Sequence, residues 1–516
     1  MTEGALRVGV DVGGTNTDAV VLDAADRVVA KAKRPTTPDV TEGLRAALDA
    51  VLAEVGTAAG RVTRVMLGTT HATNAVLERR NLGRVAVLRL GAPATTSVPP
   101  LSGWPADLRR AVSAGEAVLP GGHYVDGREI GPLDRDAIRR FLDGVTADAV
   151  AVTGVFSPAD GGHERAVAEL VGREYGLPVS LSHEIGSLGL LERENATVLN
   201  AALYGVAAHV IEALVTALAE RGLAARPYLA QNDGTLMTVE HAARLPVATI
   251  GSGPANSLRG AAFLSGVADA IVADVGGTST DLGVLAGGFP RESAAAVEIG
   301  GVLTNFRMPD ILAIALGGGS VVREHGVGPD SVGYRITEEA LVFGGATVTM
   351  TDAAVAAGRT PPGAAGWDGA PAADDLTRDL MRAAVSRADA MVADAVDRMA
   401  LGRGDRPLVA VGGGAFLLAP QIPGVSGVVR PDHAEVANAV GAAIALASGR
   451  VDTILPAGES RSKAIERAKE EAAARAVAAG ADAAQVEIVD LAEVPLSYLS
   501  EPAVRVHVKA AGPLAR

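Results

Sequence analysis

The chain contains one short stretch twice, and this duplication constrains its fold more than any other feature. The first copy runs Val8-Gly-Val-Asp-Val-Gly-Gly-Thr-Asn-Thr-Asp18, and the second, beyond the midpoint, runs Ile271-Val-Ala-Asp-Val-Gly-Gly-Thr-Ser-Thr-Asp281. Each copy has a short apolar run, a single Asp, two adjacent Gly and then Thr-x-Thr-Asp. The repetition indicates two related halves that hold one ligand between them.

The residue types of this stretch suit a phosphate chain. Glycine lets backbone N–H groups approach an anion without a Cβ in the way. The threonine hydroxyls add donors, and an Asp at a strand end can hold Mg²⁺ directly or through its waters. We therefore predict that Asp11 and Asp274 form a pair that positions magnesium. The residues predicted to cradle phosphate are Gly13, Gly14, Thr15, Asn16 and Thr17 in the first copy and Gly276, Gly277, Thr278, Ser279 and Thr280 in the second.

Each copy has an alternative interpretation as a plain β-hairpin, whose Gly-Gly pair forms a tight turn. A single copy would favour the hairpin alone. Two nearly identical copies, each with an Asp before the glycines and Thr-x-Thr-Asp after them, favour a binding site. Asp18 and Asp281 allow both interpretations, because either residue could simply begin the return strand.

The rest of the chain indicates an α/β fold with at least two domains. A chain of 516 residues is too long for one compact core, and apolar strands alternate with helical periods along it. A further strand, Leu408–Val411, leads into Gly412, Gly413 and Gly414. We predict a first domain over residues 1–190, a helical connection over 191–265, a second domain over 266–455 and a small α/β appendage over 456–516.

Composition excludes several classes of function. The net charge of −14 argues against nucleic acid as a partner, because binding a phosphate backbone needs a basic face. No run of about 18 uncharged apolar residues suggests a membrane span, and the N-terminus lacks the plan of a signal peptide, so we expect a cytoplasmic protein. The absence of cysteine excludes thiolate nucleophiles and iron–sulfur clusters.

The two glycine-rich stretches and the late triple-glycine turn resemble the actin-like ATPase superfamily. In that superfamily two ribonuclease-H-like domains each offer a phosphate hairpin, and a late glycine turn takes the adenosine. The resemblance implies ATP and Mg²⁺ as ligands, with Gly412–Gly414 at the far end of the nucleotide. The chain has no Gly-x-x-x-x-Gly-Lys-Ser/Thr motif, and no Gly-x-Gly-x-x-Gly joins a strand to a helix.

Five ordered motifs narrow the resemblance to the hydantoinase/5-oxoprolinase family, in its ATP-using A-subunit type. Together they cover roughly residues 6–450. The motifs are Gly68-Thr-Thr-His-Ala-Thr-Asn-Ala-Val-Leu-Glu-Arg79, Leu181-Ser-His-Glu-Ile185, Glu192-Arg-Glu-Asn-Ala-Thr-Val-Leu-Asn-Ala201, Gly251-Ser-Gly-Pro-Ala255 and Ile271–Asp281.

The family resemblance implies an ATP-dependent hydrolase that opens a cyclic amide such as a hydantoin, 5-oxoproline or another lactam. An amide carbonyl is a poor electrophile because of resonance, and phosphorylation of its oxygen removes that resonance. Thr69, Thr70, His71 and Asn74 would then face the substrate. Many members act with a separate B subunit, so the resemblance also implies such a partner within a homo- or hetero-oligomer.

The chain departs from the family pattern at several positions. His71 stands where the family usually has an aliphatic residue, and Asn16 where an aromatic residue is common. The segment Glu339–Gly345 replaces a Cys-Tyr-Gly segment. The chain is also shorter than typical A subunits. These departures bear on the identity of the substrate more than on ATP use.

Several ionisable residues have competing interpretations. A single His on the first turn of a helix, like His71, is more often a surface or capping residue than a catalyst. His183 and Glu184 fit either a site or a turn, whereas Glu192 and Arg193 are best explained as a pair on a helix face. The spacing of His123, Asp126 and His163 does not predict a metal site.

Other functions of the same fold remain as alternatives. In a carboxylase subunit ATP would activate a ketone carbonyl. A small-molecule kinase would stop after phosphoryl transfer and would need a carboxylate base beside the substrate hydroxyl, and the Gly68–Asn74 stretch is not typical of one. An enzyme-reactivating ATPase of the iron–sulfur type is excluded by the lack of cysteine. No feature of the sequence marks the polymer surface of an actin-like filament.

Overall fold

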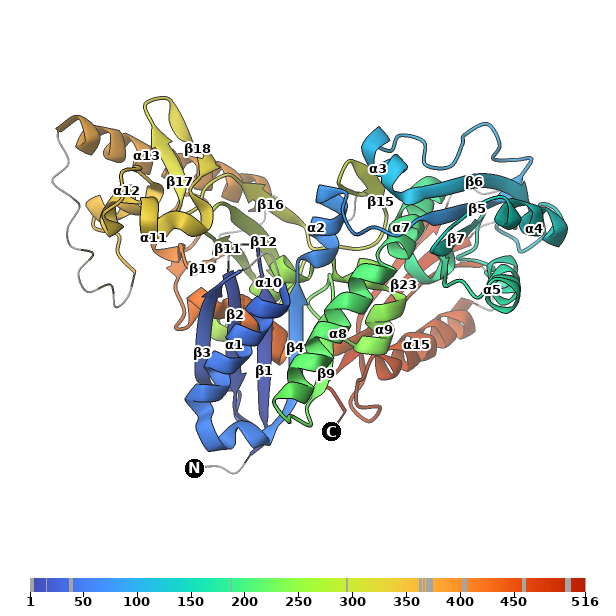
Figure 1. Cartoon of the computed structure of the whole chain (residues 1–516), viewed down its shortest axis with the longest axis horizontal. Helices are drawn as coiled ribbons and strands as arrows, with labels where there is room; N and C mark the ends of the chain where they lie inside the picture. Colours follow the sequence, from blue (N-terminus) through green and yellow to red (C-terminus); the bar gives the residue numbers. More distant parts are fainter. Residues whose placement is uncertain are drawn as a thin grey trace.

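The computed structural model describes residues 4–14, 16–36, 40–186, 188–293, 296–361, 364, 367, 375–400, 406–456, 461–496 and 503–515. Strands and helices alternate along the chain, so the predicted α/β class is confirmed (Figure 1). The described strands form a nine-stranded, a six-stranded and a four-stranded sheet and two small two-stranded ones. Thr15, one of the predicted phosphate-cradling residues, lies outside the described residues.

The nine-stranded sheet carries the first copy of the repeated stretch. Strand β1 pairs antiparallel with β2 and parallel with β4, and Asp11 lies opposite Asp18 across the β1–β2 hairpin. Helices α1, α8 and α15 cover one face of this sheet, and α14 packs on the other. The elements are β1 (Leu6–Val12), β2 (Asn16–Leu22), β3 (Val28–Pro35), α1 (Val40–Val55), β4 (Val62–Thr69), α8 (Tyr204–Glu220), β9 (Arg226–Ala230), β10 (Leu236–Thr238), α14 (Ala437–Ile444) and α15 (Arg461–Ala478).

The C-terminal strands extend this same sheet. Strand β21 (Ala447–Pro456) pairs with β10, β23 (Ala503–Gly512) pairs with β21, and β22 (Glu487–Leu496) forms the edge. The segment expected as an appendage therefore adds two strands to the sheet that begins the chain. The domain boundaries derived from the sequence stay a prediction.

The six-stranded sheet carries the second copy of the stretch in the same arrangement. Strand β11 (Ala270–Val275) pairs antiparallel with β12 (Thr280–Ala286), so that Asp274 lies opposite Asp281, and parallel with β19 (Leu408–Val411). The register matches that of the first hairpin, in which Asp11 lies opposite Asp18. The repeated sequence is thus a repeated structure. The sheet is completed by β13 (Phe289–Pro290), β16 (Ile311–Ile314) and β20 (Val428–Val429).

A four-stranded parallel sheet forms a separate layer beside the nine-stranded one (Figure 1). Its order is β6-β5-β7-β8, with β5 (Val85–Ala92), β6 (Ser113–Pro120), β7 (Ala149–Gly154) and β8 (Val179–Leu181). Helices α3 (Ala106–Val112), α4 (Arg135–Asp143) and α5 (Gly162–Glu174) belong to this part of the chain. Helix α7 (Leu190–Ala202) packs against β7 and joins the layer to the rest of the molecule.

The sequence predicts one helix over residues 192–221, but the chain forms α7 and α8 with a bend of 46° between them. At Leu203 the backbone N–H is shared between the carbonyls of Leu199 and Asn200, which tightens the turn and redirects the axis. Among the described residues no single helix is long and apolar enough to span a membrane. The bent α7–α8 pair meets the length and composition of a span only when both helices are taken together.

Two helices pack backbone to backbone between the two hairpin-bearing sheets. Helix α10 (Ser252–Ser265) contacts α14, and a glycine stands at each point of closest approach. A Cβ on Gly260 would overlap the carbonyl of Ala437, and one on Gly441 would overlap the carbonyl of Asn256. A Cβ on Gly9 in β1 would likewise overlap the carbonyl of Ala439. The halves of the molecule are therefore held at a separation that only glycine permits.

We expect Gly260→Ala to destabilise the protein by about 1–3 kcal/mol, because the added methyl group has no space at the α10–α14 contact. Urea unfolding measures the change. The matched control is Gly205→Ala, in the exposed first turn of α8, where a Cβ meets nothing and stability should rise slightly because alanine favours helix. Equal stability of the two variants would contradict the close contact.

Candidate functional site

The two repeated hairpins face each other across one cavity of about 300 Å³. The N-terminal turn of α10, the start of α14 and the turn after β19 complete its wall. Of the residues predicted from the sequence, those that line the cavity are Asp11, Gly13, Gly14, Asn16, Asp274, Gly276, Gly277, Thr278, Ser279, Gly412 and Gly413. The structure thus brings the two copies and the late glycine turn to one place.

Asp11 is buried at the end of β1 and accepts hydrogen bonds from two carboxamides. The Nδ2 atoms of Asn256 on α10 and Asn438 on α14 donate to its two oxygens, each at 3.1 Å. Gly68 on the neighbouring strand leaves room for this carboxylate, because a Cβ there would overlap Asp11 Oδ1. Gly68 therefore shapes the site by leaving space for the carboxylate of Asp11.

Asp274 has an equivalent environment in the second half. Its Oδ2 accepts a hydrogen bond from the Ser257 hydroxyl on α10 at 2.5 Å. Gly412 stands beside it with φ +85°, and a Cβ at that position would overlap Asp274 Oδ1. In both halves a glycine on the parallel neighbour strand or just after it makes space for the strand-terminal carboxylate.

The carboxylates that line the cavity outnumber the cations paired with them. Burial raises the pKa of Asp11 to about 6, against the hydrogen bond from Asn256, and the charges of Asp18 and Asp274 add to the rise. Burial, followed by the charge of Asp274, raises the pKa of Asp281 to about 7, and burial also raises the pKa of Asp274. Within the described ranges no ion pair forms on Asp11 or Asp274.

A divalent cation fits this donor set. Magnesium prefers carboxylate oxygens together with the oxygens of a phosphate chain, and a cation between Asp11 and Asp274 would offset the cost of burying two like charges. The glycine turns fit a phosphate chain, since a Cβ on Gly14 would meet nothing and one on Gly13 or Gly276 would contact only its own turn. The residues present are therefore compatible with Mg²⁺ and a nucleotide.

Three of the residues predicted to bind the nucleotide, two at the phosphates and one at its far end, have other partners. The Thr280 hydroxyl donates to the Leu316 carbonyl at 2.5 Å and is fully buried, while the Thr17 hydroxyl lies 3.3 Å from that of Thr36. The backbone N–H of Gly414 donates to the Val275 carbonyl at 2.8 Å. These residues fix the shape of the hairpins and of the late turn, and they do not line the cavity.

The predicted substrate-facing group lies beside the cavity at the start of α2 (His71–Glu78). Thr70 is close to Gly253 of the cavity wall, and Asn74 Nδ2 approaches Thr70 Oγ1 at 3.5 Å. His71 contacts the Thr69 hydroxyl and lines a different, mainly apolar pocket beneath α8. Thr70, His71 and Asn74 are not among the residues that line the cavity between the hairpins, and their catalytic roles stay a prediction.

His183 belongs to a buried polar network behind the four-stranded sheet. Its Nδ1 lies 2.5 Å from Glu164 Oε2, and the Ser182 hydroxyl donates to Glu164 Oε1 at 2.5 Å. Arg193 points inward and donates to Ser182 Oγ, so it does not serve on an exposed helix face. Glu184 pairs with Arg244 on the other side of the turn.

His123 and His163, whose spacing in the sequence does not predict a metal site, lie side by side in the fold. The rings of His123 and His163 are 4.4 Å apart, with Glu129 beside them in place of Asp126. The N–H of Gly122 donates to His163 Nδ1 at 3.0 Å, so the neutral ring carries its proton on Nε2, which faces Glu129 at 3.3 Å. A protonated Nε2 offers no lone pair to a metal, and we interpret the group as a hydrogen-bonded cluster.

Sequence reasoning missed the residues that hold the carboxylates in place. Lys33 on β3 pairs with Asp18 at 2.7 Å, and Asn438 Nδ2 bridges Asp11 and Asp18. Asn256 and Ser257 lie just beyond the quoted Gly251–Ala255 motif, so reading that motif one turn further would have found them. No local signal marks Lys33 or Asn438.

The fold and cavity define an α/β protein with two equivalent hairpins around one cavity. Residues 7–175 match the model of the hydantoinase/oxoprolinase N-terminal region, and residues 193–403 match the hydantoinase/oxoprolinase model. The chain therefore belongs to the hydantoinase/oxoprolinase family, which confirms the resemblance inferred from its motifs.

Two curated relatives are subunits of larger enzymes. The chain is 29% identical over 409 residues to the caprolactamase subunit alpha of Pseudomonas jessenii, covering 70% of this chain and 56% of that protein. It is 27% identical over 399 residues to the acetophenone carboxylase gamma subunit of Aromatoleum aromaticum, covering 69% and 53%. The chain spans about half the length of these relatives.

Two solved structures share the fold. The ATP-dependent caprolactamase from Pseudomonas jessenii superposes with a TM-score of 0.77 at 22% identity, and nucleotide-free acetone carboxylase with 0.69 at 19%. Each comparison covers 99% of this chain and 88% of the other. At these identities the likeness establishes the common architecture.

His71 gives a test of the pocket beneath α8. Burial, followed by the charge of His209, lowers the pKa of His71 to about 4. Between that value and about 6.5 the unfolded chain takes up a proton that the folded protein does not, so stability falls as pH drops. On going from pH 7.5 to pH 5, we expect the wild type to lose on the order of 1 kcal/mol more unfolding free energy than His71→Gln.

Urea unfolding at the two pH values measures this difference. The exposed His325 supplies the control, and His325→Gln should follow the wild type. A wild-type pH response equal to that of His71→Gln would show that His71 is not held neutral.

Proposed function

We propose that this chain uses Mg–ATP to activate the carbonyl of a cyclic amide, such as a hydantoin, 5-oxoproline or a related lactam, for hydrolysis. The observation that carries the proposal is the pair of hairpins in the same register, with Asp11 and Asp274 on one cavity. We further propose that the sheets bearing these hairpins are two ribonuclease-H-like domains of the actin type around a nucleotide cleft.

In this proposal each part of the cavity has a separate task. Asp11 and Asp274 hold Mg²⁺, which when bound supplies charge neutralisation to the phosphates. The N–H groups of the Gly13–Gly14 and Gly276–Gly277 turns orient the phosphate chain, and the Gly412–Gly413 turn lies beside the nucleoside. Asn256, Asn438 and Ser257 keep the two carboxylates in place through the hydrogen bonds described above.

The chemistry follows from the resistance of amides to attack. Transfer of the γ-phosphoryl group to the substrate carbonyl oxygen breaks its bond to ADP and forms a C–O–P linkage, which removes amide resonance. Water then attacks the carbon, the C–N bond breaks with the proton passing to nitrogen, and a second water releases phosphate from the acyl group. Thr70, His71 and Asn74 are the residues we propose nearest to the substrate.

The second candidate is a carbonyl-activating carboxylase subunit, since two of the related proteins bear carboxylase names. There the ketone would lose a proton from its α-carbon and take the phosphoryl group on its oxygen as an enol phosphate. Bicarbonate would then accept the phosphoryl group and break down to CO₂ and phosphate, and the α-carbon of the released enolate would attack that CO₂. A partner subunit suits both candidates, because the two curated relatives described above are both called subunits. We therefore propose a cytoplasmic oligomer with a separate B subunit.

We expect Asp274→Asn to lower Mg–ATP turnover by on the order of 100-fold or more, because the variant removes a charge that positions the metal. The apo variant should unfold at a temperature no lower than the wild type, since burial disfavours the ionised carboxylate and the Ser257 hydroxyl can reorient. Phosphate release and thermal unfolding check the two expectations. Asp330→Asn, at an exposed ion pair, is the control, and unchanged turnover in Asp274→Asn would end the assignment.

Substrate class is tested by phosphate release from Mg–ATP with a panel of lactams, hydantoins, imides and ketones. Stimulation by a cyclic amide together with a ring-opened product supports the hydrolase. Stimulation by a ketone only in the presence of bicarbonate supports the carboxylase. A stable phosphorylated product without ring opening would contradict both and favour a kinase.

A further inference from the structure

A second cavity of about 150 Å³ lies where five parts of the chain meet, and it shares no lining residue with the cavity between the hairpins. Its walls come from the turn after β8, the segment after β9, residues 306–307, strand β21 and helix α15. Because a water occupies about 30 Å³ of liquid, the space suits a small organic molecule and is too small for a nucleotide. None of the motifs discussed above assigns it a role.

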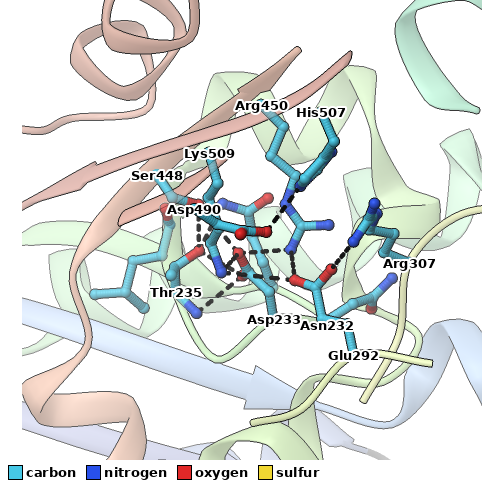
Figure 2. Close-up of polar contacts among 12 residues, drawn as sticks. Asn232, Asp233, Thr235, Glu292, Arg307, Ser448, Arg450, Asp490, His507 and Lys509 are labelled. Carbon is cyan, nitrogen blue, oxygen red and sulfur yellow. Dashed lines mark hydrogen bonds and ion pairs between the residues drawn. The ribbon is translucent and has the colours of Figure 1, made fainter. Parts of the chain in front are cut away.

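One side of this cavity is formed by a buried ionic network, which Figure 2 shows in close-up. Asp233 accepts from Arg450 at 2.7 Å and from Lys509 at 2.8 Å. Glu292 lies 2.8 Å from Arg450, 3.3 Å from Arg307 and 3.6 Å from Lys509. Asp233 and Lys509 are 2% and 5% exposed, so the charges act at low local dielectric, where an imbalance is costly.

Within these ion pairs the cations outnumber the anions by one. Although burial opposes ionisation, Lys509 and Arg450 hold the pKa of Asp233 well below its usual value, and Arg450 and Lys509 also lower the pKa of Glu292. Both carboxylates are therefore ionised at neutral pH. Three cations, Arg307, Arg450 and Lys509, thus face two anions.

Arg307 is the cation with spare donors. Its guanidinium makes one contact, at 3.3 Å to Glu292, and its other N–H groups have no partner among the described residues. Arg307 lines the cavity together with Arg450. A guanidinium with free parallel N–H groups matches the two oxygens of a carboxylate.

Another part of the cavity lining is apolar. Ile185, Leu245, Val247 and Phe306 line it, and Val247 and Phe306 are buried. An inorganic anion would leave these apolar side chains uncovered. A ligand with a hydrocarbon body would cover them, and the apolar surface removed from water would favour its binding. A ligand that suits both parts of the lining would carry one negative charge and a hydrocarbon body.

We propose that this cavity binds a small organic carboxylate, with the carboxylate on Arg307 and Arg450 and the hydrocarbon part against Val247 and Phe306. The inference goes beyond the proposed function and does not depend on ATP use. A purely structural clamp between β21, β23 and the Glu292 segment would need no excess cation and no open space beside it.

Calorimetric titration of the full chain with pentanoate, without nucleotide, tests the proposal. Pentanamide, which has the same body without the charge, and bicarbonate, which has the charge without the body, are the matched probes. We expect one pentanoate site per chain and at least tenfold weaker binding of both other probes. Absence of pentanoate binding, or equal binding of pentanamide or bicarbonate, would overturn the proposal.

Two variants locate the site. Arg307→Gln removes the spare cation, and Ala248→Leu fills the cavity without changing its charge; each should weaken pentanoate binding at least tenfold. Arg323→Gln, at an exposed ion pair with Asp330, should bind like the wild type. Unchanged binding in both cavity variants would place pentanoate elsewhere. Since no nucleotide is present, these outcomes are independent of those for Asp274→Asn.

Discussion

The structure depends on holding two carboxylates, Asp11 and Asp274, at one cavity. Burial first, and then the charges of neighbouring carboxylates, oppose the ionisation of both groups, and the protein supplies neutral donors in place of a direct cation. Gly68 and Gly412 leave the space in which these carboxylates lie. A cavity with this charge balance suits a ligand that brings its own cation, and this is the reason for proposing Mg–ATP as its ligand.

The separation of the carboxylates is set by the α10–α14 contact. Both helices carry residues of the cavity: Asn256 and Ser257 on α10, and Asn438 on α14. Because the helices touch backbone to backbone at Gly260 and Gly441, a small movement at this contact would shift both sets of donors at once. The contact thus links the packing of the two halves to the geometry of the site.

The C-terminal strands have a role that the domain prediction did not foresee. By extending the nine-stranded sheet, β21 and β23 place Arg450 and Lys509 against Asp233 and Glu292. The second cavity exists because these long-range pairings bring strands from the end of the chain to the segment after β9. It differs from the cavity between the hairpins in its lining residues and its volume.

Local patterns of the sequence determined the hairpins, the α/β class and the family, because glycine pairs, strand-terminal Asp residues and apolar periods act within a few residues. They did not determine the bend at Leu203, where one N–H is shared between two carbonyls. Only the tertiary structure decided that Lys33 and Asn438 contact carboxylates of the cavity and that Gly260 lies at the α10–α14 contact. It also decided that the hydroxyls of Thr17 and Thr280 find partners within the protein and that β21 to β23 join the first sheet. Such contacts join residues far apart in the chain, and no periodic signal records which of them will meet.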